Sequence, residues 1–151
     1  MSLRQMRFSD LNEVVCLYQD ANLFAKKTEI YTWTEKGLNS YPHLNLVYIQ
    51  KGQIIGAVSA ILQKGKKAFI NDIAIAKNYR NKKYGSKLLS KIIEIIKTEK
   101  VNSIHLWVYW KNAAVIPFYY KFGFKIKKCI NTKNISGVSD GEDFISLELK
   151  L

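Results

Sequence analysis

Residues 68–97, AFINDIAIAKNYRNKKYGSKLLSKIIEIIK, combine an apolar strand pattern, a lysine-rich turn and an amphipathic helix pattern without a break. The stretch AFINDIAIA is mostly apolar, which is typical of a strand buried on both faces. From Tyr84 to about Glu99, leucines and isoleucines recur at helical spacing. Gly85 lies close to the start of this helix. A strand that enters a helix through such a turn presents backbone amides to an anion, so the turn is a candidate phosphate-binding site.

The segments on both sides of this unit alternate between strand and helix patterns. Ser9 is expected to cap a helix that runs to about Ala21. The other predicted elements are a strand at 2–8, a helix at 34–40, a hairpin of strands 44–50 and 53–63 with a bulge at Gly56, a strand at 103–110, and closing strands at 124–130 and 143–151. This order predicts a mixed α/β sheet with helices on both faces and a ligand crevice where strand ends separate.

The segment NAAVIPFYYKFGF, residues 112–124, predicts one further helix. Asn112 is a suitable cap, and Gly123 is suited to a left-handed helix stop. Pro117 removes a hydrogen-bond donor, so this helix is expected to be short or bent.

Length and composition indicate one domain over residues 1–151. No apolar run approaches the roughly 20 residues that span a bilayer, and the first residues lack the apolar core of a signal peptide, so a cytoplasmic protein without a membrane partner is expected. Cys16 and Cys129 lack the close spacing of metal ligands and lie in apolar patterns. They are expected to be buried free thiols, and no metal site is expected.

The chain carries 24 Lys and Arg against 12 Asp and Glu, a formal net charge of +12. Such a balance favours an anionic partner. The lysines are scattered over every segment, which argues against nucleic acid and leaves a solvated basic surface as the simple interpretation. A phosphorylated ligand could bind at the turn around Gly85, because Lys82, Lys83 and Lys87 lie close to it in the sequence.

Two blocks of this sequence resemble the GNAT superfamily of N-acetyltransferases. The first is the pyrophosphate-binding signature, which here reads Arg80, Asn81, Lys82, Lys83, Tyr84, Gly85 and then Ser86. The second is KNAAVIPFYYKFGF, in which Asn112, Tyr119, Gly123 and Phe124 match the family. Two positions depart from the pattern: Lys83 replaces the first glycine of the signature, and Val115 replaces a small alanine.

The resemblance implies a fold and an activity. The fold is a mixed, mostly antiparallel sheet of about seven strands with about four helices, splayed between the fourth and fifth strands. The activity is direct transfer of an acetyl group from acetyl-CoA to a primary amine, which requires no enzyme nucleophile. The resemblance does not distinguish a peptide N-terminus, a lysine and a small amine as the acceptor. It also does not distinguish a monomer from a homodimer.

The resemblance also implies roles for individual residues. Tyr119 would protonate the departing thiolate; its simpler interpretation is one more packed aromatic, and Tyr120 is expected to pack or to face solvent. The implied cofactor-binding residues are Ile73, Ala74, Ile75, Arg80, Asn81, Lys82, Lys83, Tyr84, Gly85, Ser86 and Asn112.

The residue that accepts the amine proton is predicted to be Asp72, the one acid embedded in an apolar strand. The alternative is an aspartate held by backbone donors at a bulge. Ribosomal-protein N-terminal acetyltransferases place a glutamate at the position of Trp107, which cannot accept a proton. His105 and Tyr109 share the strand face of Trp107. Other possible proton acceptors are Glu142 or an ordered water, and a reaction without a dedicated base is a further alternative.

Acceptor binding is expected near Glu29, Tyr31 and Trp33, which follow the first helix, and near Glu142 in the acidic stretch SDGED with Asp140 and Asp143. The competing hypothesis is a basic nucleic-acid-binding or regulatory module that keeps the fold without catalysis.

Overall fold

The computed structural model describes residues 2–21, 25–133 and 142–151. Asp140, one of the acids considered for acceptor binding, lies outside these residues. The strands are β1 (Ser2–Gln5), β2 (Asn45–Gln50), β3 (Gln53–Gln63), β4 (Lys67–Ile75), β5 (Ser103–Tyr109), β6 (Lys125–Asn131) and β7 (Asp143–Lys150). The α-helices are α1 (Leu11–Ala21), α2 (Lys27–Ser40), α3 (Tyr84–Ile96) and α4 (Ile116–Tyr120).

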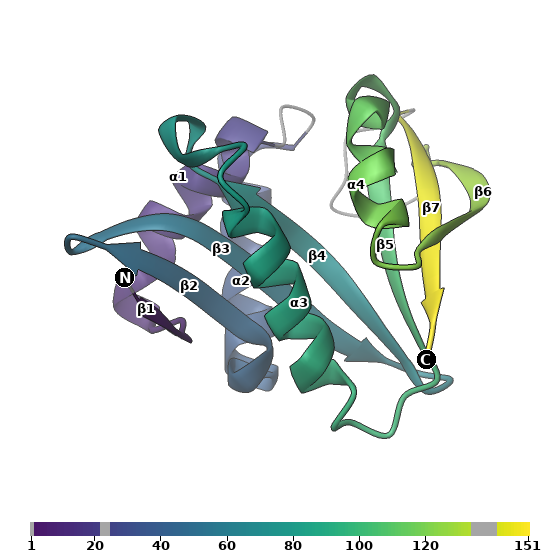
Figure 1. Ribbon diagram of the computed structural model, residues 1–151, viewed down its shortest axis with the longest axis horizontal. Coiled ribbons are helices and arrows are strands. Elements are labelled where there is room, and N and C mark those ends of the chain that lie inside the picture. The colour runs from purple at the N-terminus through teal and green to yellow at the C-terminus, as the bar shows by residue number, and fades with distance from the viewer. Residues whose placement is uncertain (1, 22–24, 134–141) are drawn as a thin grey trace.

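The seven strands form one sheet in the order β1-β2-β3-β4-β5-β7-β6 (Figure 1). Every neighbouring pair is antiparallel except β4 and β5, which are parallel. The β4–β5 ladder joins only Lys67–Phe69 to Ser103–His105, after which the two strands separate. The predicted mixed sheet, splayed between its fourth and fifth strands, is therefore confirmed.

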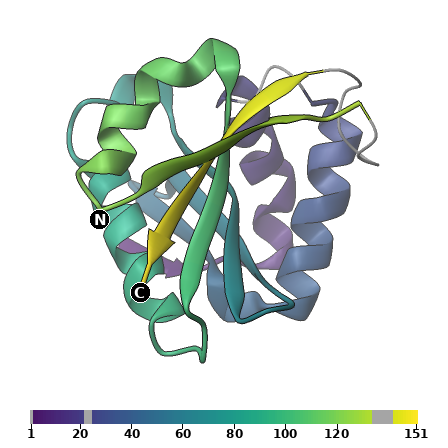
Figure 2. The same cartoon turned by 90° about the vertical axis from the view of Figure 1, so that its right-hand side faces the viewer.

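Helices α1 and α2 cover one face of the sheet, and α3 and α4 cover the other (Figures 1 and 2). Each face has its own apolar core. One core packs the leucines and isoleucines of α3 and Tyr119 of α4 against the sheet. The other packs α1 and α2 against Val47, Ala57 and Ala74. The strand–turn–helix unit of the sequence thus ties the two cores together, because β4 contributes side chains to both.

Gly56 sits at a bulge between β2 and β3, as its sequence pattern predicted. A Cβ atom at this position would lie 2.6 Å from Cδ1 of Ile75 and 2.9 Å from Cδ1 of Leu88. The ends of these two side chains would have to shift to admit a Cβ, so the glycine allows α3 to pack closely over β3 and β4 without that shift.

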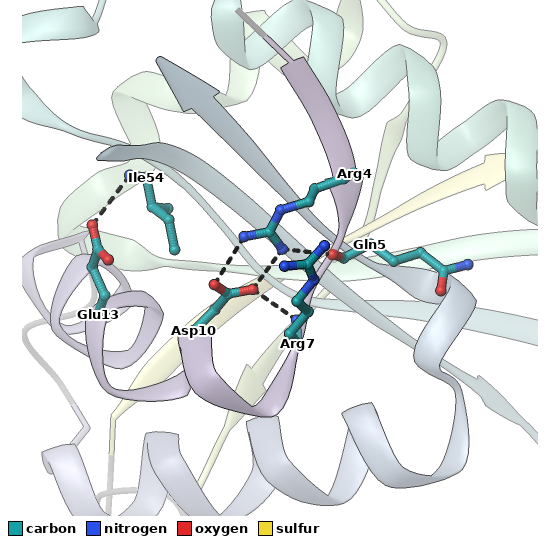
Figure 3. Close-up of polar contacts among 6 residues, drawn as sticks. All are labelled: Arg4, Gln5, Arg7, Asp10, Glu13 and Ile54. Atoms are coloured by element: carbon teal, nitrogen blue, oxygen red, sulfur yellow. Dashed lines mark hydrogen bonds and ion pairs between the residues drawn. The ribbon is translucent and has the colours of Figure 1, made fainter. Parts of the chain in front are cut away.

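The start of α1 is held by Asp10 rather than by Ser9, which lies within a 3₁₀ turn, Phe8–Asp10. The carboxylate of Asp10 accepts a hydrogen bond of 2.7 Å from the backbone N–H of Arg7 and two from the guanidinium of Arg4, at 2.7 and 3.0 Å (Figure 3). The Arg4 hydrogen bonds are the main cause that lowers the pKa of Asp10. This ion pair fixes β1 against the start of α1.

Helix α2 begins seven residues earlier than the predicted start at Thr34 (34 − 27 = 7). Its first half contains Thr, Tyr and Trp, which are weak helix formers, so local propensity pointed to a loop. Ile30, Thr34 and Leu38 are buried at intervals of four residues. Packing of this stripe against α1 and β3 outweighs the propensity.

The segment after β5 also differs from the prediction. A 3₁₀ turn occupies Trp110–Val115, and α4 begins at Ile116, so Asn112 does not cap the helix. Pro117 lies in the first turn of α4, where its missing N–H costs nothing. The expected short element is confirmed, as is the left-handed Gly123, at φ +92°.

Both cysteines are free, but they are exposed, so the expectation of buried thiols was wrong. Cys16 lies on the outer side of α1, and Cys129 lies on the edge strand β6. None of the helices in the described ranges combines the length and apolar character needed to cross a bilayer.

Candidate active site

A cavity lies where β4 and β5 separate. Its walls contain the two residues that the sequence suggested for proton transfer, Asp72 and Tyr119, together with Asn112. The complete lining consists of Ala21, Ile70, Asn71, Asp72, Ile73, Leu106, Trp107, Val108, Tyr109, Asn112, Val115 and Tyr119. Residues separated by up to 98 positions in the chain (119 − 21 = 98) therefore meet at one opening in the sheet.

A bulge in β4 turns Asp72 toward the α1/α2 side of the sheet. Ser59 pairs with Asp72 and Ala60 with Ile70, so Asn71 is the extra residue. An inserted residue reverses the alternation of side chains along a strand. The carboxylate consequently points toward α1 and α2, where Oδ2 accepts a hydrogen bond of 2.9 Å from Nε1 of Trp33. Asp72 is 4% exposed, so it is an acid held inside the protein beside the cavity.

A second buried contact supports this region of β3 and β4. The hydroxyl of Tyr18, from α1, lies 2.8 Å from Oγ of Ser59, which is the cross-strand partner of Asp72. Burial, followed by the charge of Asp72, raises the pKa of Tyr18. Tyr18 therefore remains a neutral hydrogen-bonding group next to the carboxylate.

Tyr119 reaches the cavity from the opposite face, on α4. Its side chain is 7% exposed and packs edge-to-face on Phe118 and Phe124. Burial is the first cause that raises the pKa of its phenol, and the charge of Asp72 is the second. The phenol therefore carries its proton at neutral pH and can give it to a stronger base. Tyr120, the next residue, is 49% exposed, so of the two alternatives left by the sequence it faces solvent.

The edge of β4 that faces the cavity runs through Ile73, Ala74 and Ile75. These residues pair with Val58, Ala57 and Gly56 of β3. Among the described residues, the pairing of β4 with β5 ends at Phe69. The edge of β4 beyond Phe69 therefore faces the gap between the two strands. An extended ligand can hydrogen-bond along such an edge as an added strand does.

The lysine-rich turn follows β4 and begins α3. Nε of Arg80 donates a hydrogen bond of 2.9 Å to the carbonyl of Ile75, which anchors the turn on the end of the strand. Asn81 and Lys83 have left-handed backbones, with φ of 60° and 67°. The first helical bond of α3 runs from the N–H of Lys87 to the carbonyl of Lys83. The amides before it lie ahead of the helical ladder, at the positive end of the helix dipole.

Lys82, Lys83 and Lys87 are exposed around this turn, while Tyr84, Gly85 and Ser86 are partly buried. Gly85 has no left-handed backbone, and a Cβ there would make ordinary contacts of 3.7 Å with Ile75 and Phe118. Neither the backbone of Gly85 nor the space around it therefore requires glycine in the unliganded protein.

The predicted acceptor residues are only partly gathered at the cavity. Trp33 reaches it through Asp72. Glu29 instead accepts a hydrogen bond of 3.0 Å from the backbone N–H of Lys26 at the start of α2, and Tyr31 packs on the α1/α2 core. Glu142 accepts a hydrogen bond of 2.8 Å from the hydroxyl of Tyr109, whose pKa this bond raises.

His105, an alternative proton acceptor in the sequence, is not part of the described lining. Its Nε2 lies 2.9 Å from Oγ of Ser103 and 3.2 Å from the carboxylate of Glu148. Burial lowers the pKa of this histidine. Trp107 and Tyr109 do line the cavity, and the alternation of β5 was the signal that placed them on one face.

Comparison with known proteins agrees with this geometry. The Acetyltransferase (GNAT) family model matches residues 11–124. An acetyltransferase of Pectobacterium atrosepticum is 26% identical over 130 residues, which are 86% of this chain and 92% of that protein. The crystal structure of Ard1 from Thermoplasma volcanium shares 18% identity at a TM-score of 0.83, over 99% of this chain and 97% of that chain.

The ribosomal-protein-S18-alanine N-acetyltransferase from Escherichia coli has a similar fold, with a TM-score of 0.79 at 22% identity over 99% of this chain and 92% of that chain. The family match covers both sequence blocks, the splayed strands and the cavity between them. The chain therefore belongs to the Acetyltransferase (GNAT) family, as an acetyltransferase that uses acetyl-CoA as its acetyl donor.

Proposed function

We propose that this enzyme moves the acetyl group of acetyl-CoA directly to the nitrogen of a primary amine in the cavity between β4 and β5. The observation that carries the proposal is the placement of Asp72 and Tyr119 in one cavity, on opposite faces of the sheet. An acceptor that enters from the α1/α2 side meets the carboxylate, and a thioester that lies on the α3/α4 side meets the phenol.

The reaction needs no enzyme nucleophile. The neutral amine attacks the thioester carbonyl carbon, a C–N bond forms, and the C–S bond breaks as the thiolate departs. Tyr119 gives its proton to the sulfur, and Asp72 takes the proton that the amine loses, directly or through water. Both side chains return to their starting states by exchange with solvent, so the products are the N-acetylated amine and free CoA.

The proposed cofactor contacts come from two parts of the chain. The gap-facing backbone of Ile73, Ala74 and Ile75 would hold the pantetheine arm. Arg80 and residues 81–86 would hold the pyrophosphate at the start of α3, where backbone amides and lysines favour an anion. Asn112, on the exposed turn after β5, lies beside the cavity and would contact the cofactor there.

Tyr119→Phe tests the proposed proton donor. The substitution removes one hydroxyl and little volume, so the release of free CoA thiol with a primary amine should fall by roughly 10²-fold or more, while acetyl-CoA affinity by calorimetry stays the same. Tyr120→Phe is the matched control and should retain full activity, because that side chain is 49% exposed. Equal turnover of the two variants would reduce Tyr119 to a packing residue.

A further inference from the structure

Five aromatic side chains form a continuous row across β4, β5 and β7. The row runs Phe69, Trp107, Phe144, Tyr109 and Trp110, with ring centroids 5.5, 5.9, 5.6 and 6.3 Å apart in that order. Phe69 pairs with His105, and Phe144 pairs with Tyr109, so the strand register places the four strand residues of the row on one face of the sheet. Trp110 follows in the 3₁₀ turn after β5.

This aromatic row belongs to neither described core of the protein. Phe144 is buried, Phe69, Trp107 and Tyr109 are partly buried, and Trp110 is 50% exposed. Four of the five rings therefore keep exposed surface, and aromatic surface outside the core is typical of a binding site.

The aromatic row opens directly into the active site. Trp107 and Tyr109 line the cavity that also contains Asp72. An amine nitrogen held beside Asp72 therefore places the group that carries it against these two rings. Trp107 is the candidate anchor, because it lines the cavity and contacts both Phe69 and Phe144.

The charges around the cavity favour a monoamine over a polyamine. Asp72 is the sole carboxylate among the described lining residues, and Glu142 contacts the row through Tyr109. The chain as a whole carries a net charge of +12, which repels a polycation. One ammonium group on an apolar body fits this combination.

We propose that the acceptor is a primary amine carried on an aromatic group, and that Trp107 selects it. This inference rests on the proposed amine acetylation and deepens it. Flat rings gain from edge-to-face and stacked contacts with the aromatic row beyond what apolar area alone supplies. The same chemistry is found in a free arylalkylamine and in a peptide whose first residue is aromatic.

The test compares 2-phenylethylamine with 2-cyclohexylethylamine, which is similar in size but not flat, and with spermidine. The expected kcat/KM for the phenyl compound is at least about tenfold above both others. Trp107→Leu should remove that advantage through KM, with acetyl-CoA affinity unchanged. Equal kcat/KM for the phenyl and cyclohexyl amines, or a ratio that Trp107→Leu leaves intact, would overturn the inference.

Two further experiments distinguish a free amine from a peptide acceptor, and distinguish aromatic recognition from amine acetylation. Peptides that begin with Phe or Ala are compared in the wild type and in Trp110→Leu, because Trp110 lies at the exposed outer end of the row. A loss confined to the peptides identifies a peptide acceptor, and no loss identifies a free amine. Calorimetry of 2-phenylethylamine with the CoA-bound enzyme gives a readout without turnover. If the enzyme acetylates none of the amines but binds 2-phenylethylamine, and Trp107→Leu abolishes that binding, the aromatic row is supported and amine acetylation is contradicted. If the amine does not bind at all, both are contradicted.

Discussion

Asp72 shows how one residue becomes a candidate base through its surroundings. The bulge at Asn71 directs its carboxylate to the α1/α2 side, and Trp33 donates a hydrogen bond to it from a helix 39 positions away in the chain. In the proposed reaction Trp33 is a positioning residue, because it would act through its hydrogen bond to Asp72.

Asp72→Asn should slow turnover at neutral pH, with partial recovery at high pH, where more of the amine is already neutral. Trp33→Phe should cause a smaller loss, roughly threefold to tenfold, since it leaves the carboxylate in place and removes one hydrogen bond to it. Added to Asp72→Asn, Trp33→Phe should have little further effect on kcat. The measurement is kcat against pH for the four proteins; a wild-type profile for Asp72→Asn would exclude it as the base.

Lys83 departs from the family pattern at a position where glycine has a physical advantage. Its backbone lies at φ 67° and ψ 8°, in the left-handed region, which costs a non-glycine residue about 1 kcal/mol. Lys83→Gly removes this strain, so the free energy of unfolding in urea should rise by up to ~1 kcal/mol, less the entropy that glycine adds to the unfolded chain.

Acetyl-CoA affinity of Lys83→Gly should stay similar or become tighter, because the backbone N–H at this position is retained. Asn81→Gly is the matched control: its φ is also left-handed, at 60°, but asparagine tolerates that region better, so the gain should be smaller. A large loss of affinity in Lys83→Gly would show that the ammonium group is the essential contact.

At the scale of elements, the ion pair of Arg4 and Asp10 connects β1 with the start of α1. The hydrogen bond from Arg4 is the main cause that lowers the pKa of Asp10 in the folded protein. A carboxylate with a lowered folded-state pKa adds stability above its unfolded pKa of about 4, and this contribution is lost as the pH falls through the folded pKa.

Asp10→Asn should therefore lower the free energy of unfolding by about 1–2 kcal/mol at pH 7. The side chain of Asp10 is 11% exposed, so solvent screens this pair only partly. The difference from wild type should shrink as the pH drops below about 4, because the carboxylate of the unfolded chain binds a proton there more readily than the carboxylate of the folded protein. Urea unfolding at pH 7 and pH 3 measures both; an equal difference at the two pH values would contradict the charge argument.

In the whole molecule, the separation of β4 and β5 creates the cavity that is the candidate active site. The two strands pair over three residues, Lys67–Phe69 with Ser103–His105, and then separate. Each face of the opening receives side chains from its own pair of helices, Trp33 on α2 toward Asp72 and Tyr119 on α4. Two substrates can thereby approach one cavity from opposite sides. The net charge of +12 adds a long-range attraction for the anionic donor, and salt weakens that attraction.

The local units of this protein could be predicted from its residues alone. The spacing of apolar residues and the residue types in the turns predicted β4, the lysine-rich turn, α3 and the left-handed Gly123. These features depend on neighbours within a few residues. The motif blocks singled out Tyr119 from the neighbouring aromatics; the structure buries it and exposes Tyr120. Asp72 drew attention as an acid in an apolar strand, and its burial is confirmed.

Contacts between distant elements account for the early start of α2, the loss of the Asn112 cap and the bond from Trp33 to Asp72. It also decided which way Asp72 points, since the bulge is a property of the β3–β4 register rather than of either strand. The physical reason is the same in each case. Burial and hydrogen bonding between elements distant in the chain outweigh local preferences of a few tenths of a kcal/mol per residue.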